Sequence, residues 1–262
     1  MSARLSIASV STAMDGGLTA VADISEILLA AGALDRSRLI GGVTVLLHQL
    51  RLDLDLPLRA TADADFGLTP VLLRDGSLVS TIEERGYRKV GGNRWERSLG
   101  EHRTATVDLL IPSYTSRARN DVTVGDVVTT EVPGLADALR RPAVTVDLDI
   151  MLTDRTIMTT TVVIPDAAST MGLKAWARTV RTEDRDAEDL WRCLEIAHAA
   201  GVIAIDYMAD PANDDVIAIL RREFAADGPS LSVATRGLSE LAKAQRSTRI
   251  RALLQSIVGP DE

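Results

Sequence analysis

Apolar residues recur along this chain at two different spacings, and the change between them falls near Pro165. Beyond that residue, apolar positions follow helical spacing in four successive segments: 167–181, 186–200, 211–226 and 238–258. Before it, the same spacing is confined to shorter stretches: 19–31, 78–85, 135–140 and one that runs from Gly42 to about Leu52. The pattern predicts a mixed α/β domain over residues 1–164 and a helical domain over residues 165–262.

Alternating apolar and polar positions predict the strands of the first domain. We expect them at 58–66, 102–112, 144–152 and 156–164, with the last two joined in a hairpin that turns at Asp154-Arg155. Gly91-Gly92-Asn93 is typical of a second hairpin turn. Residues 113–134 are expected to be a long loop with a short hairpin, and residues 1–17 a loosely ordered start. The predicted fold class is therefore α/β (α+β), a small mixed sheet with flanking helices followed by a helical domain.

The strand predicted at 58–66 carries an unusual row of polar side chains. Alternate residues of a strand face the same side, so Arg59, Thr61, Asp63 and Asp65 would share one face. Two carboxylates about 7 Å apart along a strand can bind one divalent cation. An unpaired carboxylate costs several kcal/mol to bury, so this row does not fit a core face. The alternative is a solvated face of an edge strand.

A glycine pair, Gly41-Gly42, precedes this row and opens a predicted helix. Paired glycines let backbone amides approach a ligand closely, and a helix N-terminus favours anions. A tight turn is the alternative. A second Asp-x-Asp, Asp147 and Asp149, lies in the strand predicted at 144–152, and the glycine pair does not directly precede it. We interpret this second pair as a decoy.

Asp108 is the single acid in the apolar strand predicted at 102–112. An acid in such a strand usually has a partner or a chemical role, and a simple ion pair with Arg103 is the alternative. Three carboxylates on two neighbouring strands are a common way to hold two Mg²⁺ ions for phosphoryl or nucleotidyl transfer. Asp63, Asp65 and Asp108 are therefore candidate metal ligands.

These motifs together resemble a known family. The glycine pair, the run Arg59-x-Thr-x-Asp-x-Asp65 and the strand Val107-Asp-Leu-Leu110 resemble the DNA polymerase β-like nucleotidyltransferase superfamily. The chain is most similar to the AbiEii/AbiGii-type nucleotidyltransferase toxins of bacterial toxin–antitoxin systems, a group that includes the mycobacterial tRNA-modifying toxins.

The resemblance continues past Pro165 and spans about residues 36–195. Toxins of this type carry a helix with a lysine, which Lys174 matches. An Arg-x-Lys-Asp stretch that leads into Asp-Leu follows, and residues 181–190 match it. Glu183 stands where the family has the lysine of this stretch, directly before Asp184.

The resemblance implies a role for each matching residue. Asp63 and Asp65 would coordinate Mg²⁺, and Asp108 would share a metal and help to activate the acceptor hydroxyl. The nucleotide and its phosphates would be bound by the remaining matches: Gly41, Gly42, Arg59, Lys174 and Asp184. For Lys174 the alternative is a solvated helix lysine, and for Asp184 an N-cap of the next helix.

Thr61 has a possible regulatory role by the same resemblance. In related toxins a Ser or Thr two residues before the first metal-binding aspartate can be phosphorylated by a kinase-like antitoxin, and Thr61 has that position relative to Asp63. Phosphate there would repel the nearby carboxylates and oppose metal or nucleotide binding. A simple preference of threonine for strands is the alternative.

Composition restricts the setting of this chemistry. The lone Cys193 among 262 residues excludes a disulfide framework and a thiolate zinc site. No apolar run is long enough to span a bilayer and no signal peptide is evident, so we expect a cytoplasmic protein without a membrane partner. The net charge is −8, but Lys and Arg cluster in residues 85–103 and near the C-terminus, where they could follow phosphates or simply form solvated surface.

The expected function is a Mg²⁺-dependent transfer of NMP from an NTP to the 3′ end of tRNA, by a toxin whose partner would be a cognate antitoxin. The active site is expected in a groove between the two domains. One alternative is modification of a protein hydroxyl or of a small molecule such as an aminoglycoside. Another is a catalytically silent binding or regulatory homologue. Asp63→Ala separates an enzyme from a binding module.

Overall fold

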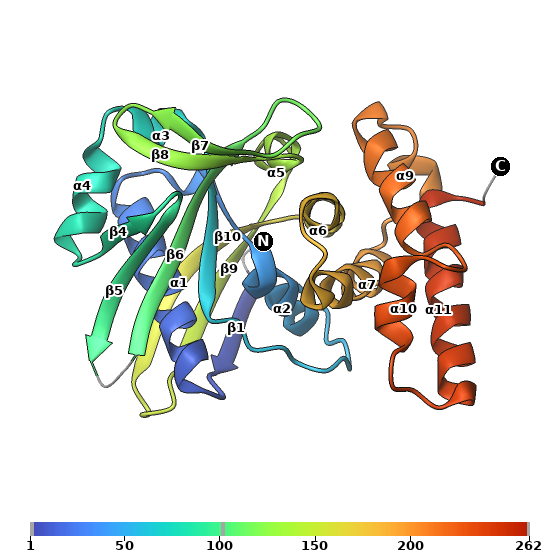
Figure 1. The fold of residues 1–262 in the computed structure, drawn as a ribbon. Coiled ribbons are helices and arrows are strands. Elements are labelled where there is room, and N and C mark those ends of the chain that lie inside the picture. Colours follow the sequence, from blue (N-terminus) through green and yellow to red (C-terminus); the bar gives the residue numbers. More distant parts are fainter. Residues whose placement is uncertain (1–2, 101–102, 261–262) are drawn as a thin grey trace. The chain divides into compact units, whose positions relative to one another are not determined.

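The computed structural model describes residues 3–100 and 103–260, and its chain divides into two compact units. The first comprises Met1–Arg51 and Pro57–Asp166, and the second comprises Leu52–Leu56 and Ala167–Glu262. Helices account for 48% and strands for 26% of the structure, so the predicted mixed α/β class is confirmed (Figure 1). The change of unit after Asp166 lies close to the predicted domain boundary, but Leu52–Leu56 was predicted in the first domain.

The larger sheet of the first unit is built around two parallel strands, β3 (Asp63–Leu68) and β6 (Arg103–Pro112). The antiparallel strand β2 (Ser37–Ile40) borders β3, and the antiparallel hairpin β4 (Arg88–Gly91) and β5 (Arg94–Gly100) borders the first half of β6. The second half of β6 pairs in parallel with β8 (Val127–Val132), which forms a hairpin with β7 (Arg119–Val124). The hairpin predicted within 113–134 is thus confirmed; residue 102, predicted to begin β6, lies outside the described part.

A smaller sheet of the same unit has the order β1-β9-β10. Its strands are β1 (Ala3–Ala8), β9 (Ala143–Met151) and β10 (Ile157–Pro165), and the predicted β9–β10 hairpin is confirmed. Asp149 on β9 binds Arg4 at 2.9 Å and accepts a hydrogen bond from Thr159 at 3.0 Å, while Asp147 accepts one from Thr161 at 2.9 Å. The second Asp-x-Asp therefore binds side chains of its own sheet.

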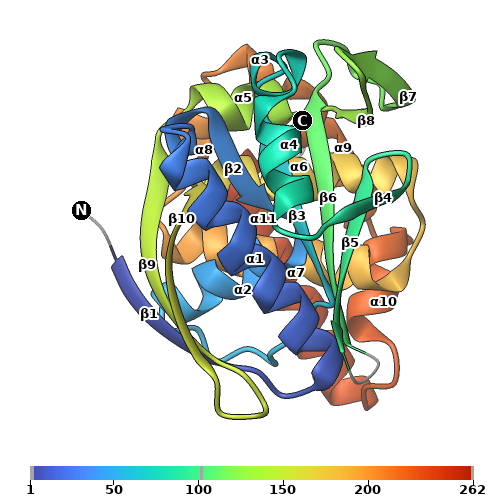
Figure 2. The same ribbon diagram turned by 90° about the vertical axis from the view of Figure 1, so that its left-hand side faces the viewer.

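Helix α1 (Thr12–Ala30) packs against β3, β6 and β10 and so contacts both sheets (Figure 2). The prediction of a loosely ordered start is wrong for residues 3–17, which hold β1 and the first turns of α1; residues 1–2 lie outside the described part. Ser11 caps α1 by accepting a hydrogen bond from the Met14 amide at 3.2 Å. Gly16 lies so close to the Thr104 carbonyl that a Cβ would overlap it. Gly16 and Gly17, a pair that is common in loops, here allow the helix to approach the sheet.

The other helices of the first unit are short and flank the larger sheet. They are η1 (Leu34–Arg36), α2 (Gly41–Arg51), α3 (Val71–Arg74), α4 (Ser77–Glu84) and α5 (Leu135–Arg140). Those predicted at 42–52, 78–85 and 135–140 are confirmed within one residue at each end.

The second unit is helical. Its elements are α6 (Ala167–Val180), α7 (Asp184–Ala199), α8 (Ala204–Tyr207), η2 (Pro211–Asn213), α9 (Asp214–Glu223), α10 (Pro229–Thr235) and α11 (Glu240–Val258). The helix predicted at 211–226 is shorter than expected, and α8 and α10 were not predicted. A buried ion pair, Arg178 Nε to Glu223 Oε2 at 3.1 Å, links α6 to α9, and Ser230 on α10 donates to the same oxygen at 2.6 Å. No helix of the described residues has the length and apolar character needed to cross a membrane.

His48 on α2 gives the first unit a pH-dependent stability. Its Nε2 lies 2.9 Å from the Pro165 carbonyl and its Nδ1 lies 3.3 Å from Arg51 Nη2, which suits a neutral ring that donates through Nε2 and accepts through Nδ1. Burial lowers the pKa of His48 from 6.5 to about 4. Between about pH 6.5 and about pH 4, the unfolded chain therefore binds a proton that the folded chain does not.

We expect the free energy of unfolding to fall by about 1 kcal/mol for each pH unit between roughly pH 6 and pH 4 because of this histidine. His48→Gln, whose amide can still donate to Pro165, should reduce that slope in denaturant titrations monitored by circular dichroism. His198→Gln, at an exposed position on α7, is the control and should leave the slope as in the parent protein. Equal slopes in all three proteins would contradict the assignment.

Candidate acidic site on strands β3 and β6

Three acids meet on one face of the larger sheet. β3 and β6 are adjacent and parallel, with Asp63 opposite Thr106 and Asp65 opposite Asp108. Residues opposite each other in register face the same side, and so do residues two apart along a strand. Asp63, Asp65 and Asp108 therefore share one face, as the strand pattern predicted.

Arg94, which the sequence reasoning missed, binds these acids. It lies opposite Asp108 in the β5–β6 register, and its Nη2 and Nε are 2.8 and 3.1 Å from the two Asp108 carboxylate oxygens. The same Nη2 lies 3.6 Å from Asp63 Oδ2. The hydrogen bonds to Asp108, and then the charges of Asp108, Asp63 and Asp65, raise the pKa of Arg94.

The suggested ion pair between Asp108 and Arg103 is wrong. Arg103 binds Asp154 at 2.9 Å and lies 3.9 Å from buried Asp15. Arg103 begins β6 and Asp108 lies five residues further along it, and the partner of Asp108 comes from the neighbouring strand instead.

The glycine pair lies directly against the acidic face. Gly41 begins α2 straight after β2, whose last residue, Ile40, is opposite Asp65. Gly41 has a φ of +76°, and a Cβ there would overlap Asp65 Oδ2. The N-terminus of an 11-residue helix is therefore held next to this carboxylate. Such an end is favourable for anions, including a phosphate.

Arg59 and Thr61 also lie beside the start of α2, but they are not part of strand β3 as predicted. The predicted strand at 58–66 begins only at Asp63, so these two residues precede it and do not extend its row. A Cβ on Gly42 would overlap Thr61 Cγ2 and would lie 2.5 Å from Arg59 Nη2. Thr61 is buried, with 7% of its surface exposed. The segment before β3 thus packs on the start of α2.

Gly41→Ala tests this close packing. Alanine would be strained at a positive φ, and its Cβ would also push Asp65 out of place, so we expect any activity that depends on Asp65 to fall by at least about tenfold. Gly32→Ala is the matched control because Gly32 has a φ of +59° but no neighbouring atom within 4 Å of a Cβ. It should lose stability alone. Equal activity losses in both variants, measured with equal folded fractions, would contradict the assignment.

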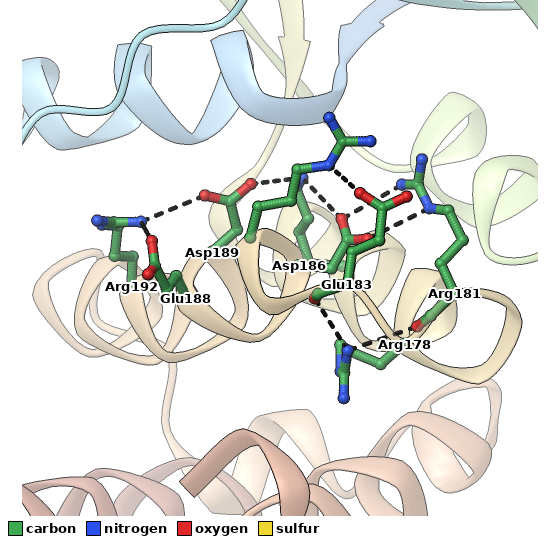
Figure 3. Close-up of polar contacts among 9 residues, drawn as sticks. Arg178, Arg181, Glu183, Asp186, Glu188, Asp189 and Arg192 are labelled. Atoms are coloured by element: carbon green, nitrogen blue, oxygen red, sulfur yellow. Dashed lines mark hydrogen bonds and ion pairs between the residues drawn. The ribbon is translucent and has the colours of Figure 1, made fainter. Parts of the chain in front are cut away.

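Lys174 lies in the second unit and is buried. Its Nζ is 2.8 Å from Asp189 Oδ2 and 3.9 Å from Asp186 Oδ1, and only 8% of its side chain is exposed. Asp186 also lies 3.3 Å from Arg181, and Asp189 lies 3.4 Å from Arg192 (Figure 3). The alternative of a solvated lysine is therefore wrong. Asp186 and Asp189, missed by the sequence reasoning, lie three residues apart on one face of α7.

Asp184 is not brought to Lys174. It is the first residue of α7, about half exposed, and it pairs with Arg236 after α10. Glu183 is the N-cap residue and makes no capping hydrogen bond through its side chain, so the N-cap alternative for Asp184 is also wrong. Glu183 instead pairs with Arg185 at 2.5 Å.

Most Lys and Arg side chains of segment 85–103 bind other groups of the first unit. Asp23 on α1 binds Arg85 at 3.0 Å, Arg97 at 2.5 Å and the Tyr87 hydroxyl at 2.8 Å. With Arg94 and Arg103 also paired to acids, four of the segment's cations bind carboxylates of the first unit. Arg88 and Lys89 donate to backbone carbonyls from exposed positions. The surface open to a phosphate chain is thus smaller than the sequence suggested.

The donor chemistry of the acidic face fits Mg²⁺. Asp63, Asp65 and Asp108 offer only carboxylate oxygens, which this cation prefers, and two of them already share a positive charge, that of Arg94. Within residues 3–100 and 103–260, no three His, Cys, Asp or Glu side chains are gathered closely enough to surround one ion.

Comparison with known proteins adds no assignment to this geometry. No protein-family model matches the sequence, and no curated protein matches it. A functional proposal therefore depends on the acids of β3 and β6, the glycines of α2 and their neighbours.

Proposed function

We propose that the chain is a metal-dependent nucleotidyltransferase of the AbiEii-like type. The observation that carries this proposal is the placement of Asp63, Asp65 and Asp108 on one face of β3 and β6, with the glycine-led N-terminus of α2 against Asp65. Carboxylates beside an anion-binding helix end suit a substrate that is a metal-bound triphosphate.

The three acids would hold Mg²⁺, which neutralises charge on the triphosphate and makes an acceptor hydroxyl easier to deprotonate. Asp108 would also accept the proton of that hydroxyl. The hydroxyl oxygen would then bond to the α-phosphorus while the bond to the β-phosphate oxygen breaks, so that pyrophosphate leaves. The amides of Gly41 and Gly42 and the guanidinium of Arg59 beside them would bind phosphate oxygens. Lys174 would bind phosphate only by exchanging its partners Asp186 and Asp189.

The favoured acceptor is the 3′ end of tRNA, in a cytoplasmic toxin controlled by a cognate antitoxin. This acceptor is supported by the resemblance and by exposed Arg88 and Lys89. The internal pairing of Arg85, Arg97 and Arg103 favours a second candidate, because fewer cations are left for a nucleic acid. That candidate is the hydroxyl of a protein or of a small molecule.

Labelled NTPs distinguish these acceptors. The protein would be incubated with Mg²⁺ and each NTP in turn, together with total bacterial RNA or with a cell protein extract. Label on tRNA-sized RNA, lost in Asp63→Ala and kept in Asp149→Ala, is the expected result. Label on protein would transfer the assignment to the second candidate. Equal labelling by Asp63→Ala and the parent protein would contradict the proposed site.

Phosphorylation of Thr61 should inactivate the enzyme. Thr61 is buried against Gly42, so a phosphate would bring negative charge beside the acids and displace the start of α2. We expect Thr61→Glu to abolish transfer and Thr61→Val, which has nearly the same shape, to keep most of it. Activity assays on both variants, matched by thermal melting, test this. Equal loss in the two variants would assign Thr61 a chemical role instead.

A further inference from the structure

Arg94 is a cation bound directly to the acidic face. Its guanidinium binds both oxygens of Asp108 in a two-pronged arrangement, lies 3.6 Å from Asp63, and is affected by the charge of Asp65. A guanidinium paired in this way with a carboxylate is one of the stronger ion pairs in proteins. The three acids therefore have a positive charge among them that belongs to the chain itself.

The other cations of the β4–β5 hairpin bind groups outside the acidic face. Arg88 donates to the carbonyls of Glu83 and Tyr87, Lys89 donates to the Val128 carbonyl, and Arg97 binds Asp23. Unlike these three residues, Arg94 contacts the acids of β3 and β6.

The Arg94 side chain can also leave its position without unfolding the sheet. Nearly half of it is exposed, at 45%, and it lies at the start of β5 directly after the glycine turn. The turn itself is fastened to β6 by a backbone hydrogen bond of 2.9 Å from the Leu109 amide to the Asn93 carbonyl. The guanidinium can therefore change partners while β5 keeps its register.

We propose that Arg94 is a resident counter-cation that competes with the divalent metal for Asp63 and Asp108 and transfers to the triphosphate when metal and nucleotide bind together. This inference rests on the proposed function and deepens it. A metal ion alone must displace the guanidinium, which then loses its carboxylate partners Asp63 and Asp108. A triphosphate supplies a new partner, because phosphate is the other group that a guanidinium binds with two parallel hydrogen bonds. Arg94 then binds the nucleotide directly and makes metal binding dependent on it.

Two binding measurements test the proposal without any turnover. The first is the affinity for Mn²⁺ alone, measured by the electron paramagnetic resonance signal of the free ion. Arg94→Met should bind Mn²⁺ about tenfold more tightly than the parent protein, because the competing hydrogen bonds are gone. The second is the affinity for α,β-methylene NTP analogues at saturating Mn²⁺, by equilibrium dialysis. Here Arg94→Met should bind about tenfold more weakly, because a phosphate contact is lost.

Matched variants make the result specific. Arg88→Met removes the same charge from the same hairpin and should change neither affinity by more than about twofold, since exposed charges are screened. Arg94→Lys keeps the charge but not the two-pronged contact and should give intermediate values; it carries the test if Arg94→Met does not fold. Tighter metal binding together with weaker nucleotide binding supports the proposal.

Two other results would overturn it. In the first, Arg94→Met binds Mn²⁺ as the parent does, while Asp63→Ala abolishes binding. Arg94 then does not compete with the metal, but the metal site and the proposed function stand. No Mn²⁺ binding by any variant, with or without nucleotide, overturns both the role of Arg94 and the metal site on which the proposed function depends.

Discussion

Asp65→Asn is expected to lower the rate of nucleotidyl transfer by about a thousandfold or more with little change in fold. Asp65 lies opposite Asp108 and touches the start of α2, so it is central among the three acids. Asparagine keeps its shape and removes its charge. Losing several kcal/mol of charge stabilisation by the metal corresponds to a thousandfold or so in rate.

Asp147→Asn is the matched control for this prediction. The same substitution there, on β9 of the smaller sheet, affects a carboxylate that accepts a hydrogen bond from Thr161. It should leave transfer within about twofold of the parent rate, with thermal melting used to equalise folded fractions. An Asp65→Asn variant as active as Asp147→Asn would exclude the acidic face as the site of reaction.

Lys174→Met is expected to lower the free energy of unfolding by about 3 kcal/mol, because removing one partner leaves buried charge uncompensated. The ion pairs of Asp189 with Arg192, at 3.4 Å, and of Asp186 with Arg181, at 3.3 Å, would remain. Denaturant unfolding of the parent and the variant measures the change. Lys243→Met on α11, at an exposed position, should change stability by less than about 0.5 kcal/mol.

A double variant separates charge from packing at the same place. Lys174→Met combined with Asp189→Leu removes both members of the 2.8 Å ion pair and should recover much of the lost stability, because apolar groups can replace a buried pair. A double variant less stable than Lys174→Met alone would mean that Asp189 is held chiefly by Arg192. Recovery of stability without recovery of transfer would support a phosphate-binding role for Lys174.

Strands and the longer helices could be predicted because burial imposes a period on the sequence. The β9–β10 hairpin, α5 and α6 agree with their predicted limits to within about two residues. Helix α1 was predicted to start too late because its first turns carry Gly16 and Gly17, which serve close packing and resemble a loop in sequence. The short helix α10 has too few apolar positions to display a period.

The three acids of the candidate site were predicted, but Arg94, the cation that binds them, was not. A strand period places Asp63 and Asp65 on one face, and the pairing of two apolar strands adds Asp108. The position of Arg94 depends on the register of the β5–β6 hairpin, which shifts between Ser98 and Gly100 and is not written in any local pattern. The partners of Lys174 depend likewise on how α6 packs on α7.

The most direct test of the central claim is which phosphate of the NTP reaches the acceptor. Parent protein, Mg²⁺ and acceptor would be incubated with NTP labelled either at the α- or at the γ-phosphate, and pyrophosphate would be measured in parallel. The account predicts α-label on the acceptor, an equal amount of pyrophosphate released, and loss of both in Asp65→Asn but not in Asp147→Asn. Transfer of γ-label, or α-label transfer that survives Asp65→Asn, would contradict it.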